Sequence, residues 1–423
     1  MKQQIFRLVA DLRFAIGILL LISLFSILGT VIEQDQSIEI YKLNYPLTNP
    51  VLGFLTWDKI LKFGLDHVYK TWWFFILIFL FGLSLISCTF LQQLPSLKIA
   101  RRCQFFRTTR QFYRLKISTV LNQFSFNKII NRIQNQNYSL FQQKNIVYGY
   151  KGVIGRIAPI LVHFSMILIL IGTIVGSLFG FKAQEIVPKT ESFHIQNILS
   201  NGQLTSIPKI SMRINDFWIT YTNSKTISQF YSDISVLDNQ GNEIKRKTIS
   251  VNSPLIYQGV YYYQTDWNLT ALRLKTINNK IVEYPLINLS PAGGNGKVWL
   301  TWIATDNSLK NGLIAVIDNL EGYCSIYNES GDFLGNLELN ETQYFKQPFT
   351  LLEILSSTGL QIKTDPGIPI IYLGFFLLMI STLISYITYS QIWLIQENKQ
   401  LYIGGTTNRA LFDFELEFFK FVQ

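Results

Sequence analysis

Cysteine is scarce in this chain, and its scarcity excludes a class of chemistry. The 423 residues include three cysteines, Cys88, Cys103 and Cys324, and no two of them form a Cys-x-x-Cys pair. Dithiol exchange of the thioredoxin type is therefore excluded, and a domain that contains Cys324 alone cannot close an internal disulfide. We interpret Cys88 as a small residue for helix packing.

Other catalytic signatures are missing as well. The chain has no Gly-x-Ser-x-Gly nucleophile elbow and no glycine-rich phosphate loop. Only three histidines occur, and two of them, His67 and His194, lie in polar segments and are expected at ordinary surface positions. His194 has neither a cysteine nor a second histidine nearby, which argues against a zinc site. A soluble hydrolase is not predicted.

Charge is absent from four long apolar runs. They are residues 14–32, 71–97, 157–181 and 366–396. Because a membrane helix needs about 20 apolar residues, each run is long enough to span a bilayer. We predict a membrane protein of the α + β class with four transmembrane helices, at 14–32, 71–91, 157–181 and 368–390.

Acidic residues are also absent from residues 92–156, which contain twelve Lys or Arg. The positive-inside rule keeps such a loop on the inner, stromal or cytoplasmic side. Residues 182–365 contain fifteen basic and seventeen acidic residues and are expected to be exported. This orientation places residues 1–13, 92–156 and 391–423 inside, and it exports residues 33–70 and 182–365. Because the positive charge is concentrated beside membrane spans, no nucleic-acid partner is predicted.

The exported segment 182–365 is predicted to form a β-rich, sandwich-like domain. Residues 211–222 and 255–267 are rich in Tyr, Ile and Trp, and they alternate in places. Turn-forming residues such as Asp238 to Asn242 separate such runs. The N-terminus resembles neither a transit peptide nor a cleavable signal, so the first span is expected to be a retained anchor. Together with the frequent Ile, Asn, Lys and Phe, this favours a protein made in a plastid or a bacterium.

His163 is the exception within the apolar runs. It lies in the 25-residue run between Arg156 and Lys182, which has no other titratable side chain. A polar ionisable group in a bilayer is expensive and by default marks a functional site, and imidazole is a common metal and haem ligand. A hydrogen bond from the ring to a neighbouring helix is the structural alternative.

The helical phase of the third span separates two faces. At 100° per residue, Arg156 falls about 20° from His163, whereas Gly172, Gly176 and Gly180 fall on the opposite face. Glycines at this spacing predict close packing of another helix. Arg156 is either an interfacial anchor or a contact for a haem propionate, and the first alternative is favoured.

A single intramembrane histidine cannot complete a bis-histidine haem site, so a second ligand would come from another polypeptide. Two other function classes fit parts of the sequence. A transporter or channel subunit would need more polar residues in its spans. A membrane-anchored scaffold or sensor, whose exported β domain binds a protein without handling haem, fits the composition equally well.

Several short motifs, in order along the chain, resemble one family. The chain resembles the ResB/CcsB proteins of System II cytochrome c biogenesis, plastid or cyanobacterial type, in the following segments: Leu12 to Ile16, Leu28 to Gln34, Trp72 to Phe74, Ser84 to Thr89, Val162 to Phe164 with Ile171 and Gly172, Val251 to Leu255 with Tyr263 and Gln264, and Asp365 to Pro369. Glu33 stands where the family commonly has proline.

The resemblance implies a function and a setting. It implies a thylakoid membrane protein that forms a complex with a CcsA-type protein carrying a tryptophan-rich haem-handling loop. The complex would transfer haem b, held transiently, and attach it to exported apocytochromes c such as those of the cytochrome f type. His163 matches the family's intramembrane haem ligand. With no Cys-x-x-Cys in this chain, a separate thiol reductant is needed, and the chain is a haem-ligase subunit rather than an enzyme by itself.

Overall fold

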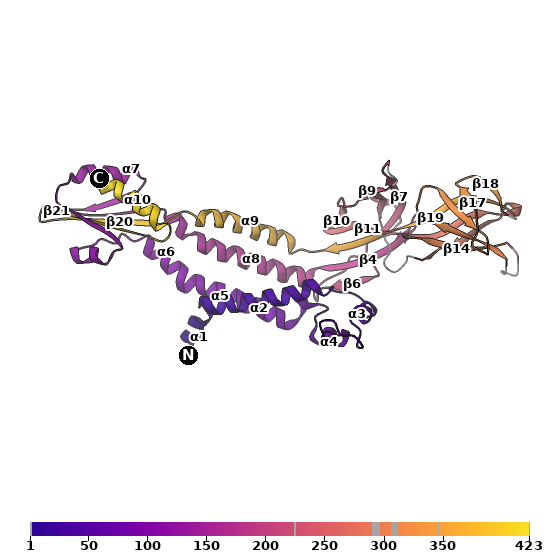
Figure 1. Cartoon of the computed structure of the whole chain (residues 1–423), viewed down its shortest axis with the longest axis horizontal. Coiled ribbons are helices and arrows are strands. Elements are labelled where there is room, and N and C mark those ends of the chain that lie inside the picture. Colours follow the sequence, from indigo (N-terminus) through magenta and orange to yellow (C-terminus); the bar gives the residue numbers. More distant parts are fainter. Residues whose placement is uncertain (1, 224–225, 290–296, 306–310, 346, 423) are drawn as a thin grey trace. The chain divides into compact units, whose positions relative to one another are not determined.

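The computed structural model describes residues 2–223, 226–289, 297–305, 311–345 and 347–422. Its contacts divide the chain into two compact units (Figure 1). One unit combines Met1–Ser177 with Pro366–Gln423, and the other is Leu178–Asp365. The first unit is therefore built from both ends of the sequence, and the second is the long segment between the third and fourth apolar runs.

In the described chain, four helical segments are long and apolar enough to cross a membrane, as predicted. They are Leu12–Val31, Trp72–Ala100, Val153–Phe179 and Ile368–Ser385. The elements within them are α2 (Leu12–Val31), α5 (Trp72–Cys88), the π-turn η2 (Thr89–Gln93), α6 (Leu94–Ala100), the 3₁₀ turn η4 (Val153–Arg156), α8 (Ala158–Phe179) and α9 (Ile368–Ser385). The short helix α1 (Lys2–Val9) precedes α2.

The ends of these helices follow local sequence. Asp11 caps α2, because its carboxylate accepts a hydrogen bond from the Arg13 amide at 2.9 Å. Pro95 lies in the first turn of α6, directly after the π-turn. Since proline has no amide hydrogen and its ring clashes with the preceding turn, the helix widens there and continues beyond the expected end at residue 91.

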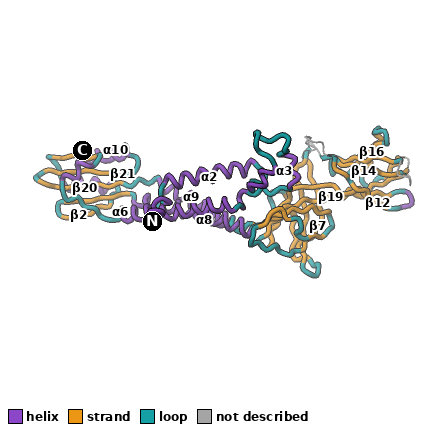
Figure 2. Tube along the Cα trace, turned by 90° about the horizontal axis from the view of Figure 1, so that it is seen from below, coloured by secondary structure: helices purple, strands orange, loops and turns teal. Residues whose placement is uncertain are grey.

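Helices α2, α8 and α9 run alongside one another (Figure 2), and the contacts among the apolar helices form two seams. On one seam Ile18 of α2 packs with Phe81 and Leu85 of α5, and side chains of α8 join them. On the other seam α8 approaches α9 through Gly172, where a β-carbon would lie 2.6 Å from the Ile371 side chain. The prediction that the glycine face packs against another helix is confirmed for Gly172.

One side chain, that of Gln34, bonds to both ends of a turn in the segment between α2 and α5. Its elements are α3 (Ile38–Asn44), α4 (Trp57–Phe63) and η1 (Val68–Lys70). The Gln34 amide donates a hydrogen bond to the Leu65 carbonyl at 2.9 Å and accepts one from the Val68 amide at 2.9 Å. Gln34, the last residue of the Leu28 to Gln34 motif, thus ties the two ends of this segment together.

Two segments fold together, although the sequence predicted a loop and a tail for them. They are residues 92–156 and 391–423. They form one antiparallel sheet in the order β1-β21-β20-β3-β2. The strands are β1 (Ile117–Leu121), β2 (Ser139–Gln143), β3 (Ile146–Lys151), β20 (Ser390–Glu397) and β21 (Gln400–Thr407), and the helical elements are η3 (Thr109–Arg114), α7 (Phe126–Asn135) and α10 (Leu411–Val422). Helices α7 and α10 cover its core.

This sheet also corrects the last expected span. The sequence prediction extended that helix to residue 390, but α9 ends at Ser385 and β20 begins at Ser390. Strand β20 is uncharged until Glu397, and Ile392 and Leu394 enter the sheet core. A buried strand can have the same uncharged, largely apolar sequence as a membrane helix. The run of residues 366–396 therefore contains both α9 and most of β20.

The second unit is β-rich, as predicted. One seven-stranded sheet contains β4 (Phe181–Pro188), β6 (Ile198–Asn201), β10 (Leu255–Tyr257), β11 (Val260–Lys275), β12 (Ile281–Pro285), β18 (Thr342–Phe345) and β19 (Gln347–Thr364). A four-stranded sheet contains β5 (Ser192–Phe193), β7 (Ser211–Tyr221), β8 (Ile227–Leu237) and β9 (Glu243–Ser250). A five-stranded sheet contains β13 (Ile287–Asn288), β14 (Trp299–Ala304), β15 (Gly312–Ile317), β16 (Tyr323–Tyr327) and β17 (Phe333–Glu338), and η5 (Ile277–Asn279) precedes β12.

Two cores, rather than the one of a single sandwich, fill this unit. The antiparallel strands β11 and β19 are long enough to contribute to both. Tyr262 and Leu360 belong to one core, and Leu272 and Leu351 belong to the other. The strands shift register between Gln264 and Asp266, which is a β-bulge close to the change from one core to the other.

Candidate functional site

The break between α1 and α2 creates a pocket beside the second span. Two backbone carbonyls at this break are satisfied by side chains of another helix. Ser84 donates to the Val9 carbonyl at 2.7 Å, and Gln92 donates to the Ala10 carbonyl at 2.9 Å. Because unpaired carbonyls are costly in an apolar setting, these two bonds allow the chain to turn there.

A cavity of about 190 Å³ lies against this break and includes His163. Its walls come from α2, α5 and α8 and from Ala10, which lies between α1 and α2. The lining residues are Ala10, Leu12, Ala15, Ile16, Leu19, Phe81, Ser84, Leu85, Cys88, Val162, His163 and Met166. Aliphatic and aromatic groups dominate the lining, which also includes the small residues Ala10 and Ala15.

The His163 ring is half-buried, and the described residues provide one side-chain hydrogen bond to it. Its Nδ1 lies 2.9 Å from the Thr89 hydroxyl, which itself donates to the Leu85 carbonyl at 2.7 Å. The bond occupies one ring nitrogen and leaves the other, Nε2, for a ligand. An imidazole in an apolar cavity can ligate the iron of a planar hydrophobic macrocycle from one side.

The structure places Arg156 apart from this cavity. Its Nη1 lies 3.3 Å from the Ser96 hydroxyl, and its guanidinium lies 4.9 Å from the Tyr389 ring centroid. The predicted common face with His163 assumed one continuous α-helix, but Arg156 belongs to the 3₁₀ turn η4, and α8 begins at Ala158. Since a 3₁₀ turn has three residues rather than 3.6, the helical phase changes there.

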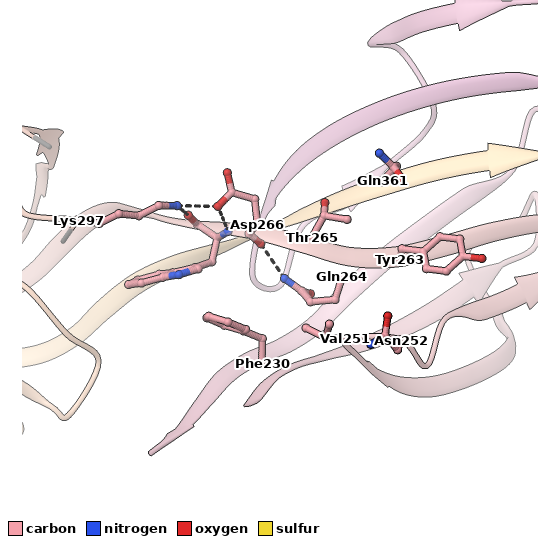
Figure 3. A pocket seen from close by; sticks show the side chains of 10 residues that line it. Phe230, Val251, Asn252, Tyr263, Gln264, Thr265, Asp266, Lys297 and Gln361 are labelled. Carbon is pink, nitrogen blue, oxygen red and sulfur yellow. Dashed lines mark hydrogen bonds and ion pairs between the residues drawn. The ribbon is translucent and has the colours of Figure 1, made fainter. Parts of the chain in front are cut away.

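A second cavity, of about 430 Å³, lies in the β-rich unit beside the bulge in β11 (Figure 3). Lys297 donates to Asp266 Oδ1 at 2.6 Å, and the Gln264 amide donates to the Asp266 carbonyl at 2.6 Å. The Gln264 side-chain oxygen accepts from Thr358 at 2.6 Å and also from Ser232. The hydrogen bonds of Gln264 therefore stay within the protein, and they connect β8, β11 and β19.

The three cysteines lie in different surroundings. Cys88 lines the cavity of His163, Cys103 is exposed, and Cys324 is fully buried. Burial raises the pKa of the Cys324 thiol to about 12, so this thiol stays protonated and unreactive. None of the three is placed to pair with another within the described chain.

The sequence alone indicates His163 but not the residues that support it. Ser84 and Thr89 belong to a motif that carries only a family resemblance, and no sequence pattern marks Gln92. A signal was present in Pro95, because a proline soon after an apolar run predicts a local change of helix geometry. The sequence could not show that the residues at this change face His163.

The fold and the site define a membrane protein with four apolar helical segments, a β-rich unit and one intramembrane histidine that lines an apolar cavity. The model of the ResB-like family matches residues 12–284 and 325–419, so the chain belongs to the ResB-like family. It is 79% identical over 423 residues to the cytochrome c biogenesis protein Ccs1 of the alga Phaeodactylum tricornutum, covering 100% of both chains. It is 45% identical to the cytochrome c biogenesis protein CcsB of the cyanobacterium Trichormus variabilis, covering 100% of this chain and 93% of that one.

One solved structure, the cytochrome c haem lyase CcmF, aligns with 73% of this chain and 30% of its own at 8% identity. The TM-score is 0.22. So slight a likeness supports no conclusion about fold or function.

Proposed function

We propose that this chain is a subunit of the System II cytochrome c synthetase and acts in haem delivery and attachment to exported apocytochromes c. The observation that carries the proposal is His163, an imidazole that lines an apolar cavity and has one ring nitrogen left for a ligand. Relatives named as cytochrome c biogenesis proteins, among them one of an alga and one of a cyanobacterium, support the process and a thylakoid-type membrane.

The cavity fits part of a haem rather than the whole. Sites that enclose a drug-sized ligand usually measure about 300–1,000 Å³, and this one measures about 190 Å³. Its apolar walls suit one face or edge of a macrocycle, and His163 supplies one axial ligand. A CcsA-type partner would supply the other ligand and cover the rest of the haem, which is substrate here and passes on to the apocytochrome.

The division of labour follows from the residues present. His163 Nε2 would hold the iron, while the apolar side chains of α2 and α5 exclude water from that face. The β-rich unit, on the exported side by the charge distribution, would position the apocytochrome or the partner. Because Cys324 is buried and protonated, reduction of the apocytochrome thiols would fall to a separate protein. Arg156 remains a proposed propionate contact only if the partner brings a propionate to it.

The test is the reduced absorption spectrum of the purified chain, with and without a co-expressed CcsA-type partner. We expect the spectrum of a bound haem in the wild-type complex and its loss in His163→Ala. His194→Ala is the matched control, since His194 is exposed in the β-rich unit and should leave the haem unchanged. A complex without haem, or one whose haem survives His163→Ala, would favour the membrane-anchored scaffold or sensor instead.

A further inference from the structure

Among the residues that the structure describes, Thr89 is the one side chain hydrogen-bonded to His163, and the proposed function does not yet use it. We propose that Thr89 is a positioning residue that holds His163 as the Nδ1–H tautomer and thereby keeps the Nε2 lone pair free for the iron of a haem. This inference rests on the proposed function for the identity of the ligand. The tautomer itself is a property of this chain alone.

The hydrogen-bond donors around Thr89 decide the tautomer. A threonine hydroxyl has one proton, and a backbone carbonyl can only accept. The Thr89 oxygen lies 2.7 Å from the Leu85 carbonyl and 2.9 Å from His163 Nδ1. Because the hydroxyl proton is used toward Leu85, the proton in the second contact belongs to Nδ1. A neutral imidazole has only one such proton, so Nε2 is left with its lone pair.

The backbone places Thr89 where its hydroxyl can contact both the Leu85 carbonyl and His163. Thr89 is the first residue of the π-turn η2, and Pro95 follows in the first turn of α6. Single π-turns within helices are frequent at functional sites because the wider turn re-aims the side chains around it. The Thr89 hydroxyl bonds to the Leu85 carbonyl of its own helix, and its oxygen contacts His163 of α8. Thr89 thus links α5 to His163 at the point where the helix widens into the π-turn.

The same arrangement is common at metal sites. A metal-ligating histidine almost always donates its other ring N–H to an acceptor, which fixes the tautomer and the ring orientation. Loss of that acceptor typically weakens metal binding about 10–100-fold. Ser84 in the same motif bonds to the Val9 carbonyl and not to the ring. The motif Ser84 to Thr89 therefore contains one residue that shapes the cavity and one that orients the ligand.

The first test needs no haem. The full chain, labelled with ¹⁵N-histidine and held in detergent micelles, contains three histidines, and His163→Ala assigns the signal of His163. We expect one protonated ring nitrogen, Nδ1, and one unprotonated, Nε2. Thr89→Val, which has nearly the same shape, should mix the tautomers, and Thr89→Ser should restore the wild-type spectrum. A protonated Nε2 in the wild type, or no change in Thr89→Val, would overturn the inference.

The second test measures haem in the complex with the partner. Thr89→Val should weaken haem retention about 10–100-fold and shift the reduced spectrum, while Thr89→Ser stays near wild type. Equal thermal midpoints of the two variants separate this effect from misfolding. Full haem retention in Thr89→Val, together with loss in His163→Ala, would refute the role of Thr89 alone. Haem retained in His163→Ala would instead refute the proposed function.

Discussion

Two cavities of this chain hold a polar side chain, and they differ in what that side chain has left to bind. At the second cavity, in the β-rich unit, Gln264 is 4% exposed and uses both its amide and its oxygen in bonds to neighbouring strands. In the apolar cavity, His163 uses one ring nitrogen for Thr89 and keeps the other. The cavity in the β-rich unit is the larger, yet its buried Gln264 is hydrogen-bonded within the protein through both its amide nitrogen and its oxygen, whereas His163 keeps one ring nitrogen.

Under the proposed function the smaller cavity is the functional one, so cavity size would be a poor guide to function in this chain. A buried polar group whose partners are all within the protein contributes stability and rigidity. A polar group that has a free lone pair and lies among apolar side chains instead favours ligand binding, because the ligand supplies the partner that the apolar surroundings lack. The two cavities should therefore respond in opposite ways to mutation: one through ligand binding and the other through folding stability.

The largest expected effect is at His163. His163→Ala should remove essentially all haem from the complex and abolish formation of holocytochrome c, and millimolar imidazole should restore part of both by occupying the space of the lost ring. The measurement is haem per complex from the reduced spectrum, before and after imidazole. Imidazole that restores haem equally well in Thr89→Val would show that the lost group in that variant is also a ligand and would contradict a positioning role.

The next effect concerns folding stability in the β-rich unit. Gln264→Leu removes the acceptor for Thr358 and Ser232 and the donor to the Asp266 carbonyl, and it should lower the free energy of unfolding by about 1–3 kcal/mol. Unfolding of the full chain by denaturant, followed by circular dichroism of the β signal, measures this. Haem content should not change. Haem loss at full stability would reveal a functional site at Gln264 and would reverse the comparison.

A third prediction tests the helix seam opposite His163. A β-carbon at Gly172 would lie 2.6 Å from the Ile371 side chain and 3.0 Å from the Gly367 carbonyl, so Gly172→Val should cost about 1–3 kcal/mol through the strain on α8 and α9. Gly17→Val is the matched control, since nothing lies within 4 Å of a β-carbon at Gly17. The thermal midpoint in detergent is the measurement. Equal thermal midpoints for the two variants would contradict a stabilising contact between α8 and α9 at Gly172.

The sequence was most informative where one physical requirement governed a whole segment. Uncharged runs predicted the four spans because burial in lipid constrains every residue of a spanning helix. The glycine face of α8 was predictable for the same kind of reason: a small residue repeats at helical spacing only if a backbone approaches closely. His163 was identified because an ionisable group in such a run is costly.

Prediction was poorer where distant segments complete one another. Strands β3 and β20 lie more than 200 residues apart in the chain, and each looks unremarkable alone, yet they are neighbours in one sheet. Neither the basic segment nor the C-terminal residues contain a full core by themselves. Likewise, the partnership of Thr89 with His163 joins two helices 74 residues apart, and no local pattern announces it.

The smallest expected effect is at Arg156, and it sharpens the boundary of the apolar cavity. The Arg156 Nη1 contact with Ser96 and the stacking on Tyr389 anchor the start of α8, so Arg156→Gln should lower stability by about 1 kcal/mol. Because Arg156 does not line the cavity of His163, haem content should stay near wild type. Arg156→Lys is the control that keeps the charge and loses the planar stacking. Haem lost in Arg156→Gln and kept in Arg156→Lys would restore the propionate contact and extend the site to the end of the span.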